Sequence, residues 1–215
     1  MAKAGRASRP GQAATSTNAT RQALVDAAIE SLRFDGFAGA SARAIAARAG
    51  SNQSLVFYHF GSVAELLLAA LDEVSARRLR RYTAAVAGID APARLVAAAT
   101  EIFREDLDEG YVTVLVEMIA GAASSPELGK QVAKRIAPWR EFAQSTIEAT
   151  ISATPLASLV PVGDAAYAVV ALYLGMEMLS HLDGDRTPAL SLFDQAARFA
   201  AVFAGAVTAN PEETR

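Results

Sequence analysis

The apolar residues of the chain recur mostly every three or four positions, which is the spacing of one face of an α-helix. One such stretch runs from Thr20 to Phe34 and is followed by Gly36, a residue that suits a helix C-terminus. The same periodicity predicts further helices at about 42–49, 53–60, 63–87, 92–108, 111–123, 126–153, 163–183 and 188–208. Pro138 lies inside the 126–153 segment and predicts a kink or a break there.

Composition supports the same fold class. Hydrophobic residues make up 52% of the 215 positions, and many of them are Ala, which favours helix because it loses no side-chain entropy there. Val, Ile and Thr are too scattered for an alternating strand pattern. We therefore expect an all-α protein with about nine helices, arranged as a three-helix head followed by a helical body.

Several chemistries are excluded or disfavoured. The chain has no Cys and only two His residues, His59 and His181, so a disulfide framework and a thiolate metal site are excluded and a metal cluster is not expected. No nucleotide-binding loop, hydrolase elbow or zinc-protease motif is present, and we expect no cofactor and no enzymatic activity. The N-terminal stretch lacks an apolar run, and the apolar window Ala165–Met176 is too short to span a bilayer, so we expect a cytoplasmic protein.

Charge is distributed unevenly. Residues 1–60 hold seven basic and three acidic residues, a net charge of +4, whereas the rest of the chain carries −7. A basic head on an acidic body suits a polyanionic partner, although an excess of four charges is small. Residues 1–19, with Lys3, Arg6 and Arg9, are predicted to be a disordered arm that either reaches DNA or only aids solubility.

The stretch from Ser41 to Ser62 carries the functional prediction. It contains two helices of about two turns joined at Gly50, with Ile45 and Val56 placed to pack beneath both. This is the arrangement of a helix-turn-helix, whose second helix enters the major groove of DNA. Outward Asn and Gln side chains can read base edges, and hydroxyls can bond phosphates or bases. The candidate DNA contacts are Ser41, Arg43, Asn52, Gln53, Ser54, Tyr58 and His59.

At these residues the chain resembles the TetR family of bacterial regulators, through GFAGASARAIAARAG and SLVFYHFGSVAELLLAAL, from about Thr20 to Leu71. Three positions depart from the family pattern. Val63 stands where Lys is common, Phe57 where Tyr is common, and Ser51 where Val is common. The first two changes remove phosphate contacts and should flatten the salt dependence of DNA binding. The third exchanges core packing for a capping hydroxyl.

The resemblance implies a division into residues 1–19 as the arm, 20–65 as the DNA-binding domain and 66–215 as the ligand-binding and dimerisation domain. It implies a homodimer that binds a double-stranded DNA operator and a largely apolar small-molecule effector, with no membrane association. The expected function is that of a repressor released from its operator by the effector. The alternative is a dimeric helical ligand-binding protein whose degenerate head does not bind DNA.

Large apolar side chains on the body helices are either ordinary core or the lining of an effector pocket. The candidate ligand contacts are Phe103, Met118, Trp139, Phe142, Tyr173, Met176 and Glu177, the last being placed to orient a polar group or to pair with His181 at the surface. The run Arg77, Arg78, Arg80 and Arg81 is interpreted as a solvated face or an ion-pair set, because it lies too far along its helix to reach DNA.

The last predicted helix offers small and apolar residues at helical spacing, which suits close packing between two copies of the chain. The candidate interface residues are Leu190, Phe193, Ala197, Ala200, Ala201 and Ala204. Burial within one copy is the alternative for the same residues, and the family resemblance favours the dimer.

Overall fold

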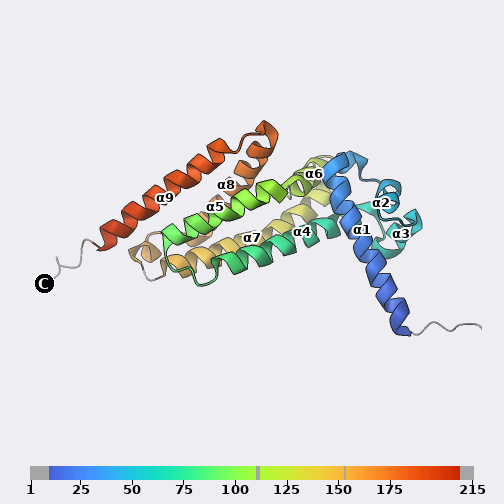
Figure 1. Ribbon diagram of the computed structural model, residues 1–215, viewed down its shortest axis with the longest axis horizontal. Coiled ribbons are helices and arrows are strands. Elements are labelled where there is room, and N and C mark those ends of the chain that lie inside the picture. The colour runs from blue at the N-terminus through green and yellow to red at the C-terminus, as the bar shows by residue number, and fades with distance from the viewer. Residues whose placement is uncertain (1–9, 110–111, 153, 209–215) are drawn as a thin grey trace, which may run out of the picture.

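The computed structural model describes residues 10–109, 112–152 and 154–208, and this part of the chain is all-α, with nine α-helices and no strand. The head consists of α1 (Pro10–Gly39), α2 (Ala42–Arg48) and α3 (Gln53–Phe60). The body consists of α4 (Val63–Val86), α5 (Pro92–Glu109), α6 (Val112–Ala122), α7 (Pro126–Ile151), the short 3₁₀ helix Pro155–Ser158, α8 (Val162–Asp183) and α9 (Thr187–Thr208). The head lies at one end of an elongated body (Figure 1), as the sequence predicts.

Two segments differ from the sequence prediction. Helix α1 begins at Pro10, so residues 10–19 are helical and not a disordered arm; a proline is tolerated in a first helical turn, where its missing N–H has no partner to lose. Residues 1–9, with Lys3, Arg6 and Arg9, lie outside the described residues. Pro138 does not split α7, which packs along α4, α6 and α8. These contacts offset the single backbone hydrogen bond that a proline removes.

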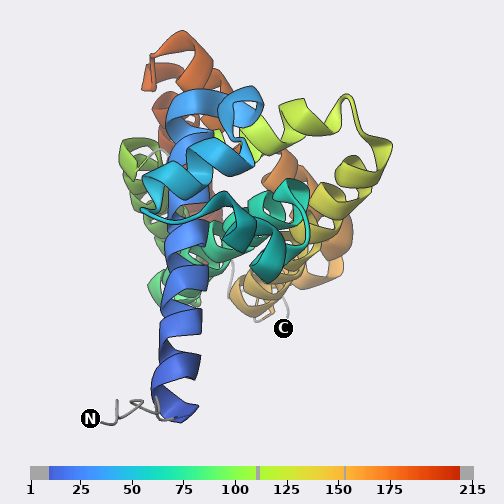
Figure 2. The same ribbon diagram turned by 90° about the vertical axis from the view of Figure 1, so that its right-hand side faces the viewer.

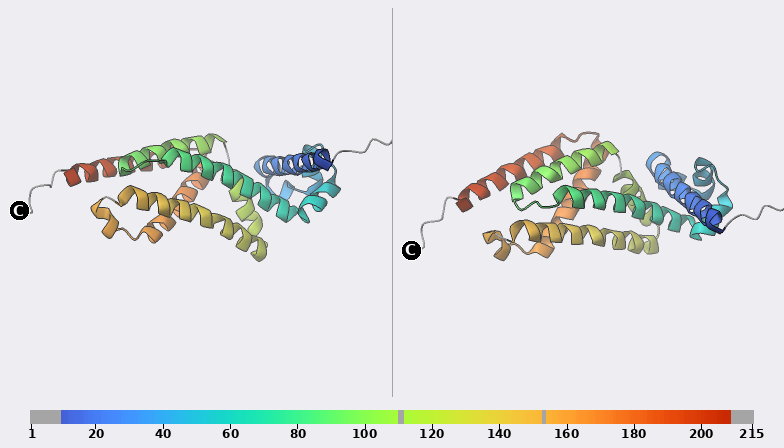
Figure 3. Two further views of the ribbon diagram at one scale, coloured as in Figure 1. Left: turned by 90° about the horizontal axis from the view of Figure 1, so that it is seen from below. Right: turned by 60° about the horizontal axis from the view of Figure 1, so that its bottom comes forward.

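One hydrophobic core joins the head to the near end of the body. Leu24, Leu32, Ile45 and Val56 are fully buried in the head, and the same cluster continues through α4 into Met118 of α6. Helix α4 belongs to both parts, since it starts beside α3 and runs along the body (Figure 3). A second, smaller cluster lies between α5, α8 and α9, around Phe103.

Helix α8 is long and apolar enough to cross a membrane, and the bent pair α3–α4 also meets the test together. The sequence prediction considered only a 12-residue window of α8, whereas the helix has 22 residues. The core helix of a folded protein meets the same criterion, and α8 buries the polar residues Glu177 and Ser180 against neighbouring helices. Only 17% of its apolar window is buried within the chain, however, so packing inside one copy leaves most of the apolar surface of α8 uncovered.

Candidate functional site

The first site is the pair α2–α3, which Figure 2 shows beside α1 at the head end of the molecule. Ser41 caps α2, since its Oγ accepts from the amide of Ala44 at 3.2 Å. Gly50 turns the chain with a φ of 60°, a left-handed conformation that costs Gly nothing. Asn52 caps α3, since its Oδ1 accepts from the amide of Ser54 at 2.9 Å. The side chains of Ile45 on α2 and Val56 on α3 are fully buried in one core with residues of α1, and this packing holds both short helices against α1.

The predicted DNA contacts are mostly on the surface. Ser41, Arg43, Asn52, Gln53, Ser54 and Tyr58 are exposed, and His59 is half-buried. Ser41 and Asn52 already use their side-chain oxygens as helix caps, which leaves Gln53, Ser54 and Tyr58 as the freer polar groups of α3. Phe57 stands on the same exposed face with 47% of its surface accessible, so α3 also presents an aromatic ring.

Ser51 does not have the capping role that the sequence suggested. Its Oγ is buried without a hydrogen-bond partner, and the neighbouring Asn52 caps the helix instead. The reason is geometric, because Asn52 has the extended backbone of an N-cap directly before the first helical residue. Compared with the Val that is common at this position in the family, Ser51 therefore has less apolar surface to pack and buries an unsatisfied hydroxyl.

A joint between head and body lies where α1 bends at Gly36. Gly36 has a φ of 71°, and the next amide, that of Phe37, donates to Oε2 of Glu117 on α6 at 2.7 Å. The ring of Phe37 packs so closely on Gly121 that a Cβ there would lie 2.4 Å from ring atoms. Sequence reasoning missed this joint, since its partners are 80 residues apart and Glu117 lies far outside the motif that contains Phe37.

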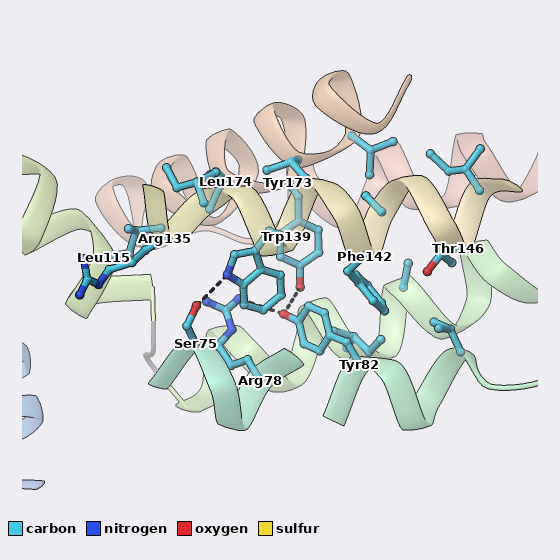
Figure 4. A pocket seen from close by; sticks show the side chains of 18 of the residues that line it. Ser75, Arg78, Tyr82, Leu115, Arg135, Trp139, Phe142, Thr146, Tyr173 and Leu174 are labelled. Atoms are coloured by element: carbon cyan, nitrogen blue, oxygen red, sulfur yellow. Dashed lines mark hydrogen bonds between the residues drawn. The ribbon is translucent and has the colours of Figure 1, made fainter. Parts of the chain in front are cut away.

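The second site is a cavity of about 200 Å³ inside the body. Apolar side chains line most of it, contributed by α4, α5, α7 and α8 with Leu115 of α6 (Figure 4). Aromatic rings gather at its centre, where Tyr82 lies 5.2 Å from Trp139 and 6.2 Å from Tyr173 between ring centroids. Such a concave apolar site with a few polar groups is typical of a small-molecule pocket.

The structure brings three of the seven predicted ligand contacts into the cavity wall: Trp139, Phe142 and Tyr173. Phe103 and Met176 pack instead in the cluster between α5, α8 and α9, and Met118 lies in the core shared with the head. Glu177 is buried and pairs with Arg78, not with His181 at the surface. These four lie outside the cavity wall, since periodicity identifies a buried face but not which neighbour covers it.

Next to the cavity lies a buried ion network. Arg78, only 6% exposed, donates to Asp106 and to Glu177 at 2.6 Å each. Arg81 also contacts Asp106, while Tyr82 donates to Tyr173 at 3.0 Å and Tyr173 donates to Asp106 at 2.9 Å. The predicted ion-pair set is thus confirmed for Arg77, Arg78 and Arg81. Arg77 pairs with Asp26 of α1 and with Glu73, whereas the partners of Arg78 and Arg81 come from α5 and α8.

Burial dominates the electrostatics of this network. It raises the pKa of Glu177 from 4.5 to about 7, with Arg78 lowering the pKa and Asp106 raising it. Burial, reinforced by the charge of Asp106, raises the pKa of Tyr173, so its phenol stays protonated. Burial lowers the pKa of Arg78, but Glu177 and Asp106 outweigh it and the net shift is upward. Two guanidiniums therefore face two carboxyl groups, one of which holds its proton unusually well.

The outer side of α8 and α9 exposes two matching apolar stripes. Leu172, Leu179 and Leu182 follow one another on α8, and Leu192, Phe199 and Val202 repeat the same spacing on α9. Of the predicted interface residues, Leu190 and Phe193 turn inward to the cluster around Phe103, as the alternative of burial within one copy allowed. Ala197 and Ala201 are exposed, Ala200 is half-buried, and the side chain of Ala204 lies outside the described residues.

The head decides the family. A sequence profile described as "Bacterial regulatory proteins, tetR family" matches residues 24–70, which span the buried stripe of α1, both short helices and the start of α4. The matched head, residues 24–70, is that of the TetR family of bacterial regulators.

Other TetR-like proteins resemble the chain beyond the head. The chain is 32% identical over 105 residues to uncharacterized HTH-type transcriptional regulators of Mycobacterium bovis and Mycobacterium tuberculosis. The match covers 49% of this chain and 54% of each relative, so the chain spans about half the length of these relatives. A TetR-family member from Streptomyces coelicolor is 26% identical, with a TM-score of 0.64 over 82% of this chain and 97% of its own. FadR from Bacillus subtilis, solved with stearoyl-CoA, shares the fold at 13% identity and a TM-score of 0.70 over 83% and 96%.

Proposed function

We propose that this TetR-family chain is a homodimeric repressor whose head binds operator DNA and is released when a small molecule enters the body cavity. The observation that carries the proposal is the exposed face of α3, which presents Gln53, Ser54 and Tyr58 on a helix held by the buried Ile45 and Val56. Gln can contact the edge of adenine with two hydrogen bonds, and the hydroxyls can contact bases or phosphates.

Dimerisation is supported by the apolar stripes of α8 and α9. The large apolar side chains Leu172, Leu179 and Leu182 on α8 and Leu192, Phe199 and Val202 on α9 are exposed, and large uncovered apolar areas are rare on isolated soluble proteins. A second copy related by two-fold symmetry would cover both stripes at once and build a four-helix interface. That symmetry would present two α3 helices to successive turns of the major groove, roughly 34–36 Å apart.

Two connections would couple the cavity to the head. Helix α4 carries Arg78 and Tyr82 at the cavity and packs at its other end on α1 and α3. Helix α6 carries Leu115 at the cavity and Glu117 at the joint with Phe37. A ligand that binds one arrangement of these helices more tightly than another shifts the separation of the two heads, and only such a difference in affinity produces release.

The test is DNA binding by the purified protein, measured by fluorescence anisotropy on the DNA that flanks its own gene and on an unrelated duplex. Arg43→Ala should weaken binding to both duplexes and reduce the slope of log affinity against log salt by about one, because one phosphate contact is lost. Arg94→Ala removes the same charge from an exposed position on α5 and should leave both quantities unchanged. Gln53→Ala should reduce the preference for the specific duplex by about 1–3 kcal/mol.

Failure to bind any duplex at low salt would contradict the proposal and favour the second candidate, a ligand-binding dimer with a degenerate head. Val63 and the exposed Phe57 are the features that favour this alternative, because they stand where the family commonly has phosphate-binding side chains. Ligand binding to the body would then persist without any effect on DNA.

A further inference from the structure

We infer that the effector is a small uncharged molecule with a mostly hydrocarbon surface, and that the cavity rejects carboxylates of the same shape. The inference rests on the proposed function in taking the cavity between α4, α5, α7 and α8 as the effector site. It follows from three properties of the cavity wall: its volume, its apolar lining, and the way in which its charged groups are already paired.

The cavity is partly open, and its volume suits a compact molecule. A protein cavity of about 150 Å³ holds benzene, so the 200 Å³ found here accommodates on the order of ten non-hydrogen atoms. Long acyl chains exceed that size. The rings of Tyr82, Trp139, Phe142 and Tyr173 offer faces and edges that suit an aromatic or alicyclic body.

The charged side chains of the wall have partners within the protein. Arg135 binds Asp72 through two hydrogen bonds of 2.7 and 2.9 Å. Arg78 binds Asp106 and Glu177, and its guanidinium carbon lies 5.4 Å from the centre of the Trp139 ring. The Nε of Arg78 has no acceptor, but it is sealed within the wall and not open to the cavity. A ligand therefore meets ring faces and aliphatic carbon. The two arginines of the wall do not form an anion site, because their charges are already paired within the protein.

Neutral polar groups fit the same pattern. The indole N–H of Trp139 donates to Oγ of Ser75 at 2.7 Å, and the Tyr82 hydroxyl is used by Arg78 and Tyr173. Thr146 adds a neutral hydroxyl to the wall, pointing in beside Phe142 (Figure 4). One hydroxyl or carbonyl on a ligand can be accommodated there, whereas a full charge cannot.

A carboxylate in the cavity would lack a counter-charge. Arg78 pairs with Asp106 and Glu177, and Arg81 pairs with Asp106 and with the more exposed Glu105 and Glu109, so carboxyl groups already outnumber the two guanidiniums before any ligand enters. A carboxylate from a ligand would have to displace one of these or stay buried and unpaired, which costs enough to weaken binding at least about 100-fold.

The experiment compares two probes that differ by one group. Butylbenzene and 4-phenylbutanoate share the same phenyl-alkyl body, with a terminal methyl in one and a carboxylate in the other. The chain has a single Trp, Trp139, and it lines the cavity, so selective Trp excitation reports occupancy directly. At about pH 8, where the carboxylate is ionised, we expect saturable binding of butylbenzene and binding of 4-phenylbutanoate that is at least about 100-fold weaker. Equal or tighter binding of 4-phenylbutanoate would overturn the inference.

Two variants test the reasons separately. Glu177→Gln removes one counter-charge of Arg78 and should strengthen 4-phenylbutanoate binding at least tenfold while leaving the affinity for butylbenzene unchanged. An unchanged ratio of the two affinities would overturn the charge argument. Ala143→Leu fills the cavity and should weaken butylbenzene at least tenfold, whereas Ala149→Leu, on the exposed side of α7, should not. Wild-type affinity in a folded Ala143→Leu protein would place the ligand elsewhere and overturn the inference.

The outcome is separable from that of the proposed function. Butylbenzene that binds at Trp139 without changing the affinity for DNA supports the chemistry inferred for the cavity and counts against the ligand-responsive release. Release of DNA by 4-phenylbutanoate alone supports the proposed function and overturns this inference.

Discussion

Glu177 offers a test of the buried ion network through the pH dependence of stability. Its carboxyl has a pKa of about 7 in the folded protein against an ordinary value of 4.5, because burial disfavours its charged form. Between these two values the folded protein binds the proton more tightly than the unfolded chain does. The contribution of Glu177 to the free energy of unfolding therefore falls as the pH rises from 4.5 to about 7 and is constant above that window.

The size of the effect follows from the same values. At 1.36 kcal/mol per pH unit, the interval from 4.5 to about 7 corresponds to a loss of about 3 kcal/mol. Glu177→Gln substitutes a neutral amide of similar shape for the protonated carboxyl and removes the titration. Relative to the wild-type protein, the variant should have similar stability near pH 4.5 and gain up to about 3 kcal/mol as the pH rises through 7.

Urea denaturation of both proteins at a series of pH values and one fixed protein concentration measures this difference. Titrations of the other carboxyl groups are common to both proteins and cancel. Glu148→Gln, at an exposed position on α7, is the matched control and should shift stability by the same small amount at every pH. A difference for Glu177→Gln that stays flat, or that falls with rising pH, would refute the reasoning.

Three further changes test the core, the joint and the dimer. Ser31 is fully buried and its hydroxyl has no partner, so Ser31→Ala should raise the free energy of unfolding by about 1 kcal/mol in urea denaturation, and a loss of stability would contradict this. Gly121→Ala places a Cβ against the Phe37 ring and should lower the free energy of unfolding by about 1–3 kcal/mol and weaken DNA binding. Gly129→Ala meets only ordinary contacts and should raise the free energy of unfolding by up to about 1 kcal/mol. Similar effects of the two substitutions would argue against the joint. Phe199→Asp should shift the protein from dimer to monomer in sedimentation velocity. If the variant remains a dimer, the outer face of α9 is not part of the interface.

The sequence is most informative where one segment determines its own structure. Apolar periodicity placed α5 to α9 within one or two residues of their observed ends, because each helix has a continuous apolar face and a Gly, Ser or Pro at its boundary. The helix-turn-helix was found for the same reason, since its caps, its turn and its buried Ile45 and Val56 all lie within 22 residues.

Contacts between distant segments could not be predicted in this way. Arg78 and Glu177 are 99 residues apart, and nothing along the chain indicates that they meet. Four of the seven proposed ligand contacts were misplaced because a large apolar residue fills a core and lines a cavity with the same spacing. The packing of α9 could not be predicted for a related reason: an Ala-rich helix has small residues on every face, and only its neighbours show that Leu190 and Phe193 are covered within the chain while Ala197 and Ala201 are exposed.

Helix α6 carries one residue of the cavity wall and two residues that contact the head within two turns of each other. Leu115 borders the cavity, Glu117 and Gly121 hold the head, and six residues of helix separate the first from the last, a length of about 9 Å. Most of the cavity wall belongs to other helices. Residues of the wall outside α6 can therefore be replaced without touching the contacts that Glu117 and Gly121 make with the head, so the proposed function predicts that new effector specificities can be engineered into this scaffold.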